Sequence, residues 1–243
     1  AVLTAGLICG ALAGILIYAK VKPELDQCRV IAYDKLAQME RTDFSMLSDT
    51  VIYDKDGRQV GLINAGHYQY VDISHISMNI QNAYIAQEDR RFKSHTGVDW
   101  IATFRAGLAL LKHNGQVTQG GSTITQQLAK NEYFTQEKTL TRKIAEVFMA
   151  LKIERELDKD TILSLYVNSI NFGSGYETVA AASWGYFGKE PGQMNDWEAT
   201  ILAGIPNAPS VYSLDASPEL AAQRQKQVLE RMLRCDKITE EKV

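Results

Sequence analysis

The chain contains few of the residues that build disulfide scaffolds or metal clusters. Only 3 cysteines and 4 histidines occur among its 243 residues. Three cysteines provide no disulfide framework, so free thiols are the default expectation, and Cys28 and Cys235 could pair only if the fold brought them together. The histidines show neither an HExxH pattern nor a Cys/His ligand spacing. The sequence therefore argues against a dedicated zinc site.

A surplus of positive charge is also missing. The chain carries 26 lysines and arginines against 29 acidic residues, a formal net charge of −3. A general nucleic-acid binder would have a basic surplus, so nucleic acid is not expected as a partner. An anionic ligand would have to be held by a local cluster of cations. With 5 prolines, 17 glycines and 45% hydrophobic residues, the composition is that of a globular protein.

One long uncharged run stands at the N-terminus. Residues 1–19 contain no charged residue, and as a helix they would extend nearly across the ~30 Å hydrocarbon core of a bilayer. We expect a transmembrane anchor here, followed by a linker or membrane-proximal segment at residues 20–49. A secretory signal peptide is the alternative, but the run is long for one and no clear cleavage site precedes Lys20.

Periodicity predicts a mainly α-helical body with one short β-hairpin, in a domain that spans residues 50–243. Two β-rich runs flank an Asp-Gly turn within residues 50–63, which is the strongest local signal for a hairpin. Apolar residues recur at helical spacing after Asp99, which can serve as an N-cap, and again in residues 140–151. The Ser-Pro pair at residues 217–218 opens a last long helix.

Two adjacent carboxylates fall where a predicted helix ends. The turns before Glu88 and Asp89 can be helical, so both acids stand at a helix end beside which a cleft could open. A carboxylate in a cleft can act as a general base when partial burial raises its pKa. Taken alone, the two acids are more simply a solvated pair balanced by Arg90, Arg91 and Lys93.

A second segment, residues 120–130 (GGSTITQQLAK), combines a glycine pair, hydroxyls, amides and a cation at a predicted helix start. Thr123 and Gln126 fit a capping box, which would by itself explain why a helix begins there. The capping box does not account for the glycines, for Gln127 or for Lys130. Because their donors suit sugar hydroxyls or a diphosphate, the segment indicates a sugar-bearing or phosphate-bearing ligand.

A third segment, residues 142–146 (RKIAE), supplies further charge. Arg142 and Glu146 at (i, i+4) are most simply an ordinary surface ion pair, worth about 0.2–0.5 kcal/mol. Together with Lys130 and Lys138, however, these cations could converge on one pyrophosphate leaving group, where preorganised positive charge has its largest effect.

These three segments together resemble the signature of the peptidoglycan glycosyltransferases, a family that includes the polymerase domain of bifunctional penicillin-binding proteins and the monofunctional transglycosylases. Segments similar to the family's fourth and fifth motifs lie at residues 162–189 and 198–210, so the resemblance covers about residues 51–232. Ala145 departs from the pattern, because family members often carry a second lysine before the glutamate. No Ser-x-x-Lys or Lys-Thr-Gly occurs, so the acyl-transfer motifs of a transpeptidase are missing from this sequence.

The resemblance implies a lysozyme-like large lobe, a smaller membrane-proximal lobe, and a cleft between them that takes lipid II. Glu88 would deprotonate the 4-hydroxyl of the acceptor sugar, which attacks the anomeric carbon of the lipid-linked donor with inversion and releases undecaprenyl diphosphate. Glu146 is the second catalytic candidate. The implied substrate-binding residues are Asp89, Phe92, His95, Gly121, Ser122, Thr123, Gln126, Gln127, Lys130, Asn131, Lys138, Arg142, Lys143, Asn168, Gly175, Tyr176 and Asn207.

The partners implied by the resemblance are lipid II, the growing lipid-linked glycan chain, the bilayer and other cell-wall synthesis proteins. The location implied is the cell membrane, with a single span and the catalytic domain on the extracytoplasmic face. The sequence requires no cofactor, although Mg²⁺ or Mn²⁺ could neutralise the diphosphate.

Two other functions stay open at this point. A cell-wall hydrolase or lytic transglycosylase would use Glu88 as a general acid, but hydrolysis has no diphosphate leaving group to explain the cations. A non-catalytic, membrane-anchored scaffold could bind the lipid-linked saccharide without reacting with it.

Overall fold

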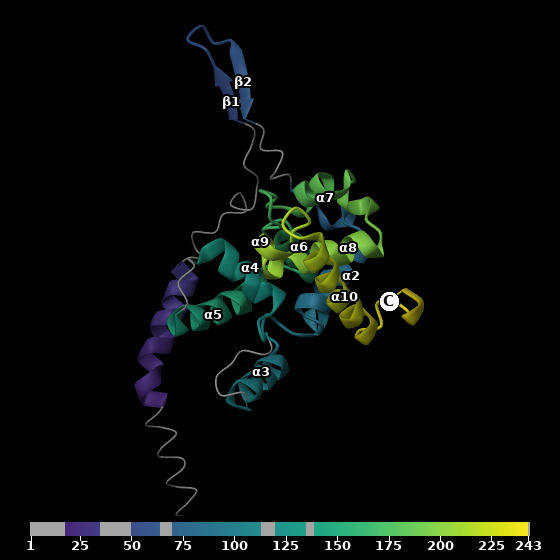
Figure 1. Cartoon of the computed structure of the whole chain (residues 1–243). Coiled ribbons are helices and arrows are strands. Elements are labelled where there is room, and N and C mark those ends of the chain that lie inside the picture. Colours follow the sequence, from purple (N-terminus) through teal and green to yellow (C-terminus); the bar gives the residue numbers. More distant parts are fainter. Residues whose placement is uncertain (1–17, 35–49, 64–69, 113–119, 135–138, 243) are drawn as a thin grey trace, which may run out of the picture.

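The computed structural model describes residues 18–34, 50–63, 70–112, 120–134 and 139–242 of the chain. These residues form a mainly helical structure with one two-stranded sheet, as the periodicity predicts (Figure 1). Residues 1–17 of the predicted anchor lie outside the described part. Within that part, no helix combines the length and the apolar character that a membrane span requires.

The predicted hairpin is present. Strand β1 (Thr50–Tyr53) pairs antiparallel with β2 (Gln59–Ile63), and Figure 1 shows the pair standing away from the helical body. The turn is held by Asp54, whose carboxylate accepts a hydrogen bond from the amide of Asp56 at 2.8 Å. Gly57 has a φ of +79°, a conformation that side-chain-bearing residues rarely adopt, so the Asp-Gly sequence itself specifies this turn.

The helical body contains both long helices and short 3₁₀ turns. Its α-helices are α2 (Met78–Glu88), α3 (Trp100–Lys112), α4 (Ile124–Tyr133), α5 (Leu140–Glu156), α6 (Lys159–Val167), α7 (Val179–Phe187), α8 (Asp196–Gly204), α9 (Pro209–Tyr212) and α10 (Pro218–Arg234). Two of the predicted starts are confirmed in detail. Thr123 and Gln126 form the capping box of α4, and Ser217 caps α10 by accepting a hydrogen bond from the amide of Leu220.

The N-terminal described segment, residues 18–34, is helical and buries Cys28 and Ala32. Cys28 and Cys235 are both free thiols, so the default expectation is confirmed for these two cysteines. Cys9 lies outside the described residues.

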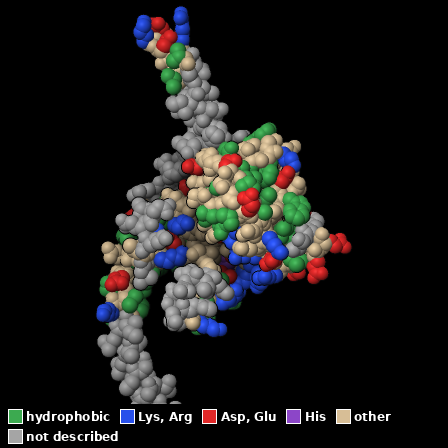
Figure 2. All heavy atoms as spheres, viewed as in Figure 1, with side chains coloured by type: hydrophobic (Ala, Val, Ile, Leu, Met, Phe, Trp, Pro, Cys, Tyr) green, Lys and Arg blue, Asp and Glu red, His purple; other side chains and the backbone are tan. Residues whose placement is uncertain are grey.

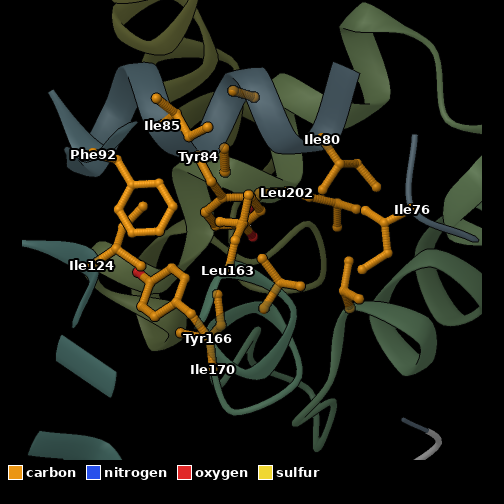
Figure 3. Close-up of a cluster of buried hydrophobic side chains, with 14 of the residues drawn as sticks. Ile76, Ile80, Tyr84, Ile85, Phe92, Ile124, Leu163, Tyr166, Ile170 and Leu202 are labelled. Atoms are coloured by element: carbon orange, nitrogen blue, oxygen red, sulfur yellow. The ribbon is translucent and has the colours of Figure 1, made fainter. Parts of the chain in front are cut away.

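The core is built around α2. This helix packs against α8 and α10, while α4 packs against α5 and α6. Figure 3 shows Tyr84 of α2 in one cluster with Leu202 of α8 and Leu163 of α6, and all three side chains are fully buried. The rings of Tyr84 and Tyr166 meet edge to face with 6.0 Å between their centroids. The C-terminal end of α2, which carries Glu88, is therefore fixed by a close-packed core.

Asn168, at the end of α6, ties the segment that precedes α2 to the helical body. Its Oδ1 accepts a hydrogen bond from the backbone amide of Val71 at 3.0 Å, and its Nδ2 donates to the carbonyl of Val71 at 2.9 Å. Nδ2 also donates to the carbonyl of Ser164 at 2.8 Å. The side-chain amide thus pairs with both backbone groups of Val71, as a neighbouring strand would.

We expect Asn168→Ala to lower the free energy of unfolding by about 1–3 kcal/mol, because the half-buried backbone amide of Val71 would lose its partner and its carbonyl would keep only the hydroxyl of Ser164, at 3.2 Å. Urea unfolding followed by circular dichroism measures the change. Asn131→Ala is the matched control, since the Asn131 side chain is exposed and makes one long contact, 3.4 Å, to the carbonyl of Ser169. Equal stability of the two variants would contradict this role of Asn168.

Candidate active site

A cleft of about 740 Å³ opens at the C-terminal end of α2. Its walls come from the end of α2, the segment before α4, and parts of α3, α4, α5 and α10. Figure 2 shows lysine and arginine side chains gathered on this side of the body, over the region between α3 and the end of α10. The predicted site residues that line the cleft are Glu88, Asp89, Gly121, Ser122, Thr123, Gln126, Gln127, Lys130, Lys143, Glu146 and Asn207.

Glu88 is the last residue of α2, as the sequence predicts, and it is half-buried. Its Oε2 accepts a hydrogen bond from Nε2 of Gln127 at 2.8 Å. The other end of that amide, Oε1 of Gln127, accepts from the hydroxyl of Tyr166 at 3.3 Å. No described residue donates a hydrogen bond to Oε1 of Glu88, so this oxygen is available to a ligand in the cleft.

Asp89 has a different environment from its neighbour. It is 6% exposed, and its Oδ2 accepts hydrogen bonds from the amide of Ile124 at 3.1 Å and from Nε2 of His95 at 2.8 Å. Because Nδ1 of His95 accepts from the amide of Gly97, we assign the ring hydrogen to Nε2. Gly97 has a φ of +96°, and a Cβ there would lie 2.7 Å from the carbonyl oxygen of Ala150, so only glycine fits.

Glu146 lies between two cations at the start of α5. Its carboxylate is 1% exposed, its Oε2 accepts from Nζ of Lys143 at 2.8 Å, and its Oε1 lies 2.9 Å from Nε of Arg142. The contact with Arg142 has the predicted (i, i+4) spacing, but the pair is largely buried and is not the surface ion pair that the spacing alone suggested. Its angle is not that of a hydrogen bond. Nζ of Lys143 also donates to the hydroxyl of Ser122 at 2.8 Å, which joins the second motif to the third.

Not all of the cations predicted to bind the diphosphate line the cleft. Lys130 lines the cleft from α4 and has no ion-pair partner among the described residues. Lys143 lines it from α5, whereas Arg142 does not line it. Lys138 lies outside the described residues, so its predicted role stays a prediction.

The cleft is also lined by several arginines, which sequence reasoning did not select as ligands. Arg224, Arg231 and Arg234 come from α10, and they are joined by Arg90 after α2 and Arg105 from α3. The signal for the first three was present, because a spacing of seven and then three residues places them on one face of a helix.

Arg224 is the most buried of these arginines, at 8% exposure. Its Nε is buried and has no hydrogen-bond partner among the described residues, and burial lowers its pKa, with Arg231 acting in the same direction and Glu88 opposing. A Cβ at Gly204 would lie 2.9 Å from Cγ of Arg224, so the glycine leaves room for the arginine side chain. Nη1 of Arg224 donates to Oε1 of Gln227 at 2.7 Å, so Nε is the part of this buried cation that can donate to an anion in the cleft.

The remaining predicted residues take other places. Phe92 is fully buried in the core, and the ring of Tyr176 packs edge to face on Tyr186 with 5.0 Å between centroids. Gly175 occupies a turn with a φ of +82°. The predicted site residues that the structure describes outside the cleft lining are Phe92, His95, Asn131, Arg142, Asn168, Gly175 and Tyr176.

Asp99 fixes α3 at the edge of the cleft. Its Oδ1 accepts a hydrogen bond from the amide of Ala102 at 2.7 Å, which confirms it as the N-cap. Both of its oxygens also pair with Arg91, with Nε donating to Oδ2 at 2.7 Å. The hydrogen bond from Arg91 holds the pKa of Asp99 below its ordinary value.

The chain is similar to known proteins across most of its length. Residues 56–233 match the family model described as Transglycosylase. The chain is 46% identical over 190 residues to penicillin-binding protein 1A of Aquifex aeolicus, a match that covers 78% of this chain and 26% of that protein. It is 40% identical over 211 residues to penicillin-binding protein 1A of Neisseria gonorrhoeae, with 86% and 26% covered. The chain thus spans about a quarter of the length of these relatives.

Two further similar proteins come from other organisms. A Cupriavidus necator protein named as a transglycosylase is 44% identical over 170 residues, which cover 70% of this chain and 73% of that protein. The crystal structure of penicillin-binding protein 1A from Haemophilus influenzae aligns with a TM-score of 0.43 at 21% identity, covering 81% of this chain and 20% of that one.

We expect Asp99→Asn to lower the free energy of unfolding at pH 7 by about 1–3 kcal/mol, because Arg91 loses a charged partner. Since the folded protein lowers the pKa of Asp99, its contribution is present above the ordinary value of 3.8 and is lost as the pH falls through the lower folded value. Denaturation curves at decreasing pH should therefore show wild type and variant converging in acid.

The control for this experiment is Asp160→Asn, because Asp160 pairs with Lys93 at the surface, where both side chains are more than half exposed. This variant should stay close to wild type at every pH. A stability difference for Asp99→Asn that does not change with pH would show that the ion pair is not its cause.

Proposed function

The chain belongs to the transglycosylase family, the peptidoglycan glycosyltransferases, and from that premise we propose that it polymerises lipid II into linear glycan strands. The 4-hydroxyl of an acceptor sugar attacks the anomeric carbon of a lipid-linked donor. A β-1,4 bond forms with inversion, the bond to the diphosphate breaks, and undecaprenyl diphosphate leaves. The observation that carries the proposal is a carboxylate, Glu88, that shares one cleft with several cations.

Glu88 is the proposed general base. Gln127 holds one of its oxygens, and the other is open to the cleft, where it can accept the proton of the attacking hydroxyl. Asp89 is the weaker candidate, because its carboxylate is buried and already accepts two hydrogen bonds. The donor carries a good leaving group, so the reaction needs a base and a site for negative charge more than it needs a general acid.

The leaving diphosphate is proposed to bind at Lys130 and Lys143. Lys130 has no ionic partner among the described residues, and Ser122 and Glu146 orient Lys143. In this scheme Glu146, the second catalytic candidate, acts by holding two cations in place rather than by transferring a proton. Fixed positive charge that faces a developing negative charge lowers the barrier most in a site shielded from water.

Both substrates of this reaction carry a diphosphate, so a second anionic group must be accommodated. We assign it to the arginines of α10, among which Arg224 is buried with an unpartnered Nε. No group of three or more His, Cys, Asp or Glu side chains suited to a metal ion occurs in the described ranges. Mg²⁺ or Mn²⁺, where used, would arrive with the diphosphate and neutralise its charge.

The proposal extends to the surroundings of the site. A lipid-linked substrate requires access from a bilayer, so we propose a membrane location with the catalytic domain on the extracytoplasmic face. The division into a lysozyme-like lobe and a membrane-proximal lobe, implied by the family resemblance, belongs to the same proposal. A hydrolase that uses Glu88 as a general acid would leave the cations of the cleft without a function.

We expect Glu88→Gln to lower the rate of glycan formation from labelled lipid II by about 10²–10⁴, because the amide cannot accept the proton. Binding of lipid II, measured separately, should change little, since the amide keeps the shape of the side chain. Glu177→Gln, at an exposed position outside the cleft, is the matched control and should polymerise like wild type. Turnover by Glu88→Gln within tenfold of wild type would rule out Glu88 as the base.

We expect Lys130→Ala to lower turnover of lipid II by about 10²-fold, because a cation that faces the leaving group is lost. Lys152→Ala, which breaks an exposed (i, i+4) pair with Glu156, should change the rate by less than about twofold. Partial rescue of Lys130→Ala by added Mg²⁺ would show that the lost charge acted on the diphosphate. A folded, fully active Lys130→Ala would remove the main physical support for a polymerase.

A further inference from the structure

We propose that Tyr166 is a positioning residue for the general base, and that it acts by fixing the orientation of the Gln127 side-chain amide. The proposal rests on the proposed function, in which Glu88 is that base. Tyr166 is not among the residues that line the cleft. Its influence would reach the reaction through one intervening side chain.

Three side chains from three helices form the relay. The hydroxyl of Tyr166, on α6, donates to Oε1 of Gln127 at 3.3 Å. Nε2 of Gln127, on α4, donates to Oε2 of Glu88, on α2, at 2.8 Å. The relay therefore begins in the hydrophobic core and ends on the carboxylate in the cleft.

One end of the Gln127 amide is a hydrogen-bond donor and the other an acceptor, so the orientation of the amide decides which of them faces the Glu88 carboxylate. With Nε2 toward Glu88, the carboxylate receives a hydrogen bond; with the amide turned over, Oε1 would face it as a second acceptor. A phenol hydroxyl has one hydrogen to donate, and Oε1 is the end of the amide that can accept it. With the Tyr166 hydroxyl as donor to Oε1, both ends of the amide are paired in the orientation that binds Glu88, whereas the turned-over amide would point Oε1 at the carboxylate.

Tyr166 is suited to remain such a donor. Burial first, and then the charge of Glu88, raise the pKa of Tyr166 well above its ordinary value, so the phenol keeps its hydrogen over the working range of the enzyme. The side chain is fully buried, and Figure 3 shows its ring in the core beside Ile124 and Phe92. Close packing holds the hydroxyl in place.

The simpler explanation is that Gln127 merely satisfies the buried hydroxyl of Tyr166. Tyr84 provides an internal comparison, because it is equally buried and its hydroxyl donates to the carbonyl of Leu202 at 3.1 Å. That bond leads away from Glu88 to the backbone of α8. Tyr84→Phe and Tyr166→Phe each remove one buried hydroxyl, but only the second removes a donor that acts on Gln127.

The first test is the pH dependence of lipid II polymerisation. Tyr166→Phe should lower kcat by about three- to tenfold with little change in KM. The acid limb of its pH profile should move to higher pH, because a carboxylate with a less ordered donor is protonated more readily. Tyr84→Phe should keep the wild-type profile even if its thermal stability falls. Identical pH profiles for the two variants would overturn the proposal.

The second test asks whether Tyr166 acts through Gln127. In a double-mutant cycle, Tyr166→Phe should have no further effect on kcat in the Gln127→Ala background. An effect of the same size in both backgrounds would show that the hydroxyl acts independently of Gln127, and would overturn the relay.

The third test needs no substrate, so its result is independent of the proposed function. A carbon-13 NMR titration of the Glu88 carboxyl should show the midpoint moving to higher pH in Tyr166→Phe and staying unchanged in Tyr84→Phe. An unchanged midpoint in Tyr166→Phe would overturn the relay. Wild-type protein that forms no glycan from lipid II, but shows the expected shift, would instead overturn the proposed function and leave the relay standing.

Discussion

The geometry of the cleft depends on the hydrogen bonds that the buried carboxylate of Asp89 accepts. Its Oδ2 accepts two hydrogen bonds, one from the amide of Ile124, the first residue of α4, and one from Nε2 of His95. Helix N-termini leave amides unpaired and carry partial positive charge, so a carboxylate is a favourable partner there. This bond joins the end of α2 to the start of α4. Glu88 and Gln127 then lie opposite each other, 2.8 Å apart between Oε2 and Nε2.

Three of the four carboxylates that line the cleft, those of Glu88, Asp89 and Glu146, have three different environments. Glu88 is half-buried with one oxygen engaged, Asp89 is buried and bound to the protein, and Glu146 lies between Arg142 and Lys143. In the proposed mechanism only the first of these exchanges a proton with a ligand. Residue type alone would not separate them, whereas hydrogen bonding and charge do.

The features that the sequence predicts correctly are local ones. The capping box of Thr123 and Gln126, the Asp-Gly turn of the hairpin and the ion pair of Arg142 with Glu146 each depend on residues at most four positions apart. Their geometry follows from the helix or turn alone. The position of Glu88 at the end of α2 follows in the same way.

The features that the sequence does not predict depend on long-range packing. A helical repeat places Arg224 and Arg231 on one face of α10. The repeat does not show that this face lies near Glu88, because the neighbours of the face come from other helices. For the same reason, the motif resemblance selects Asn168 and Tyr176 as ligands, whereas the structure gives their side chains backbone and aromatic partners outside the cleft. Tyr166 looks like an ordinary core residue until Gln127 is placed beside it.

In the proposed mechanism Glu88 is the base, and the cations of the cleft face the leaving diphosphate. A structure of the protein with lipid II bound tests it most directly. We expect the acceptor 4-hydroxyl within about 2.6–3.2 Å of the Glu88 carboxylate and the donor diphosphate on Lys130 and Lys143. A 4-hydroxyl placed on Glu146, or a donor diphosphate bound away from both lysines, would contradict it.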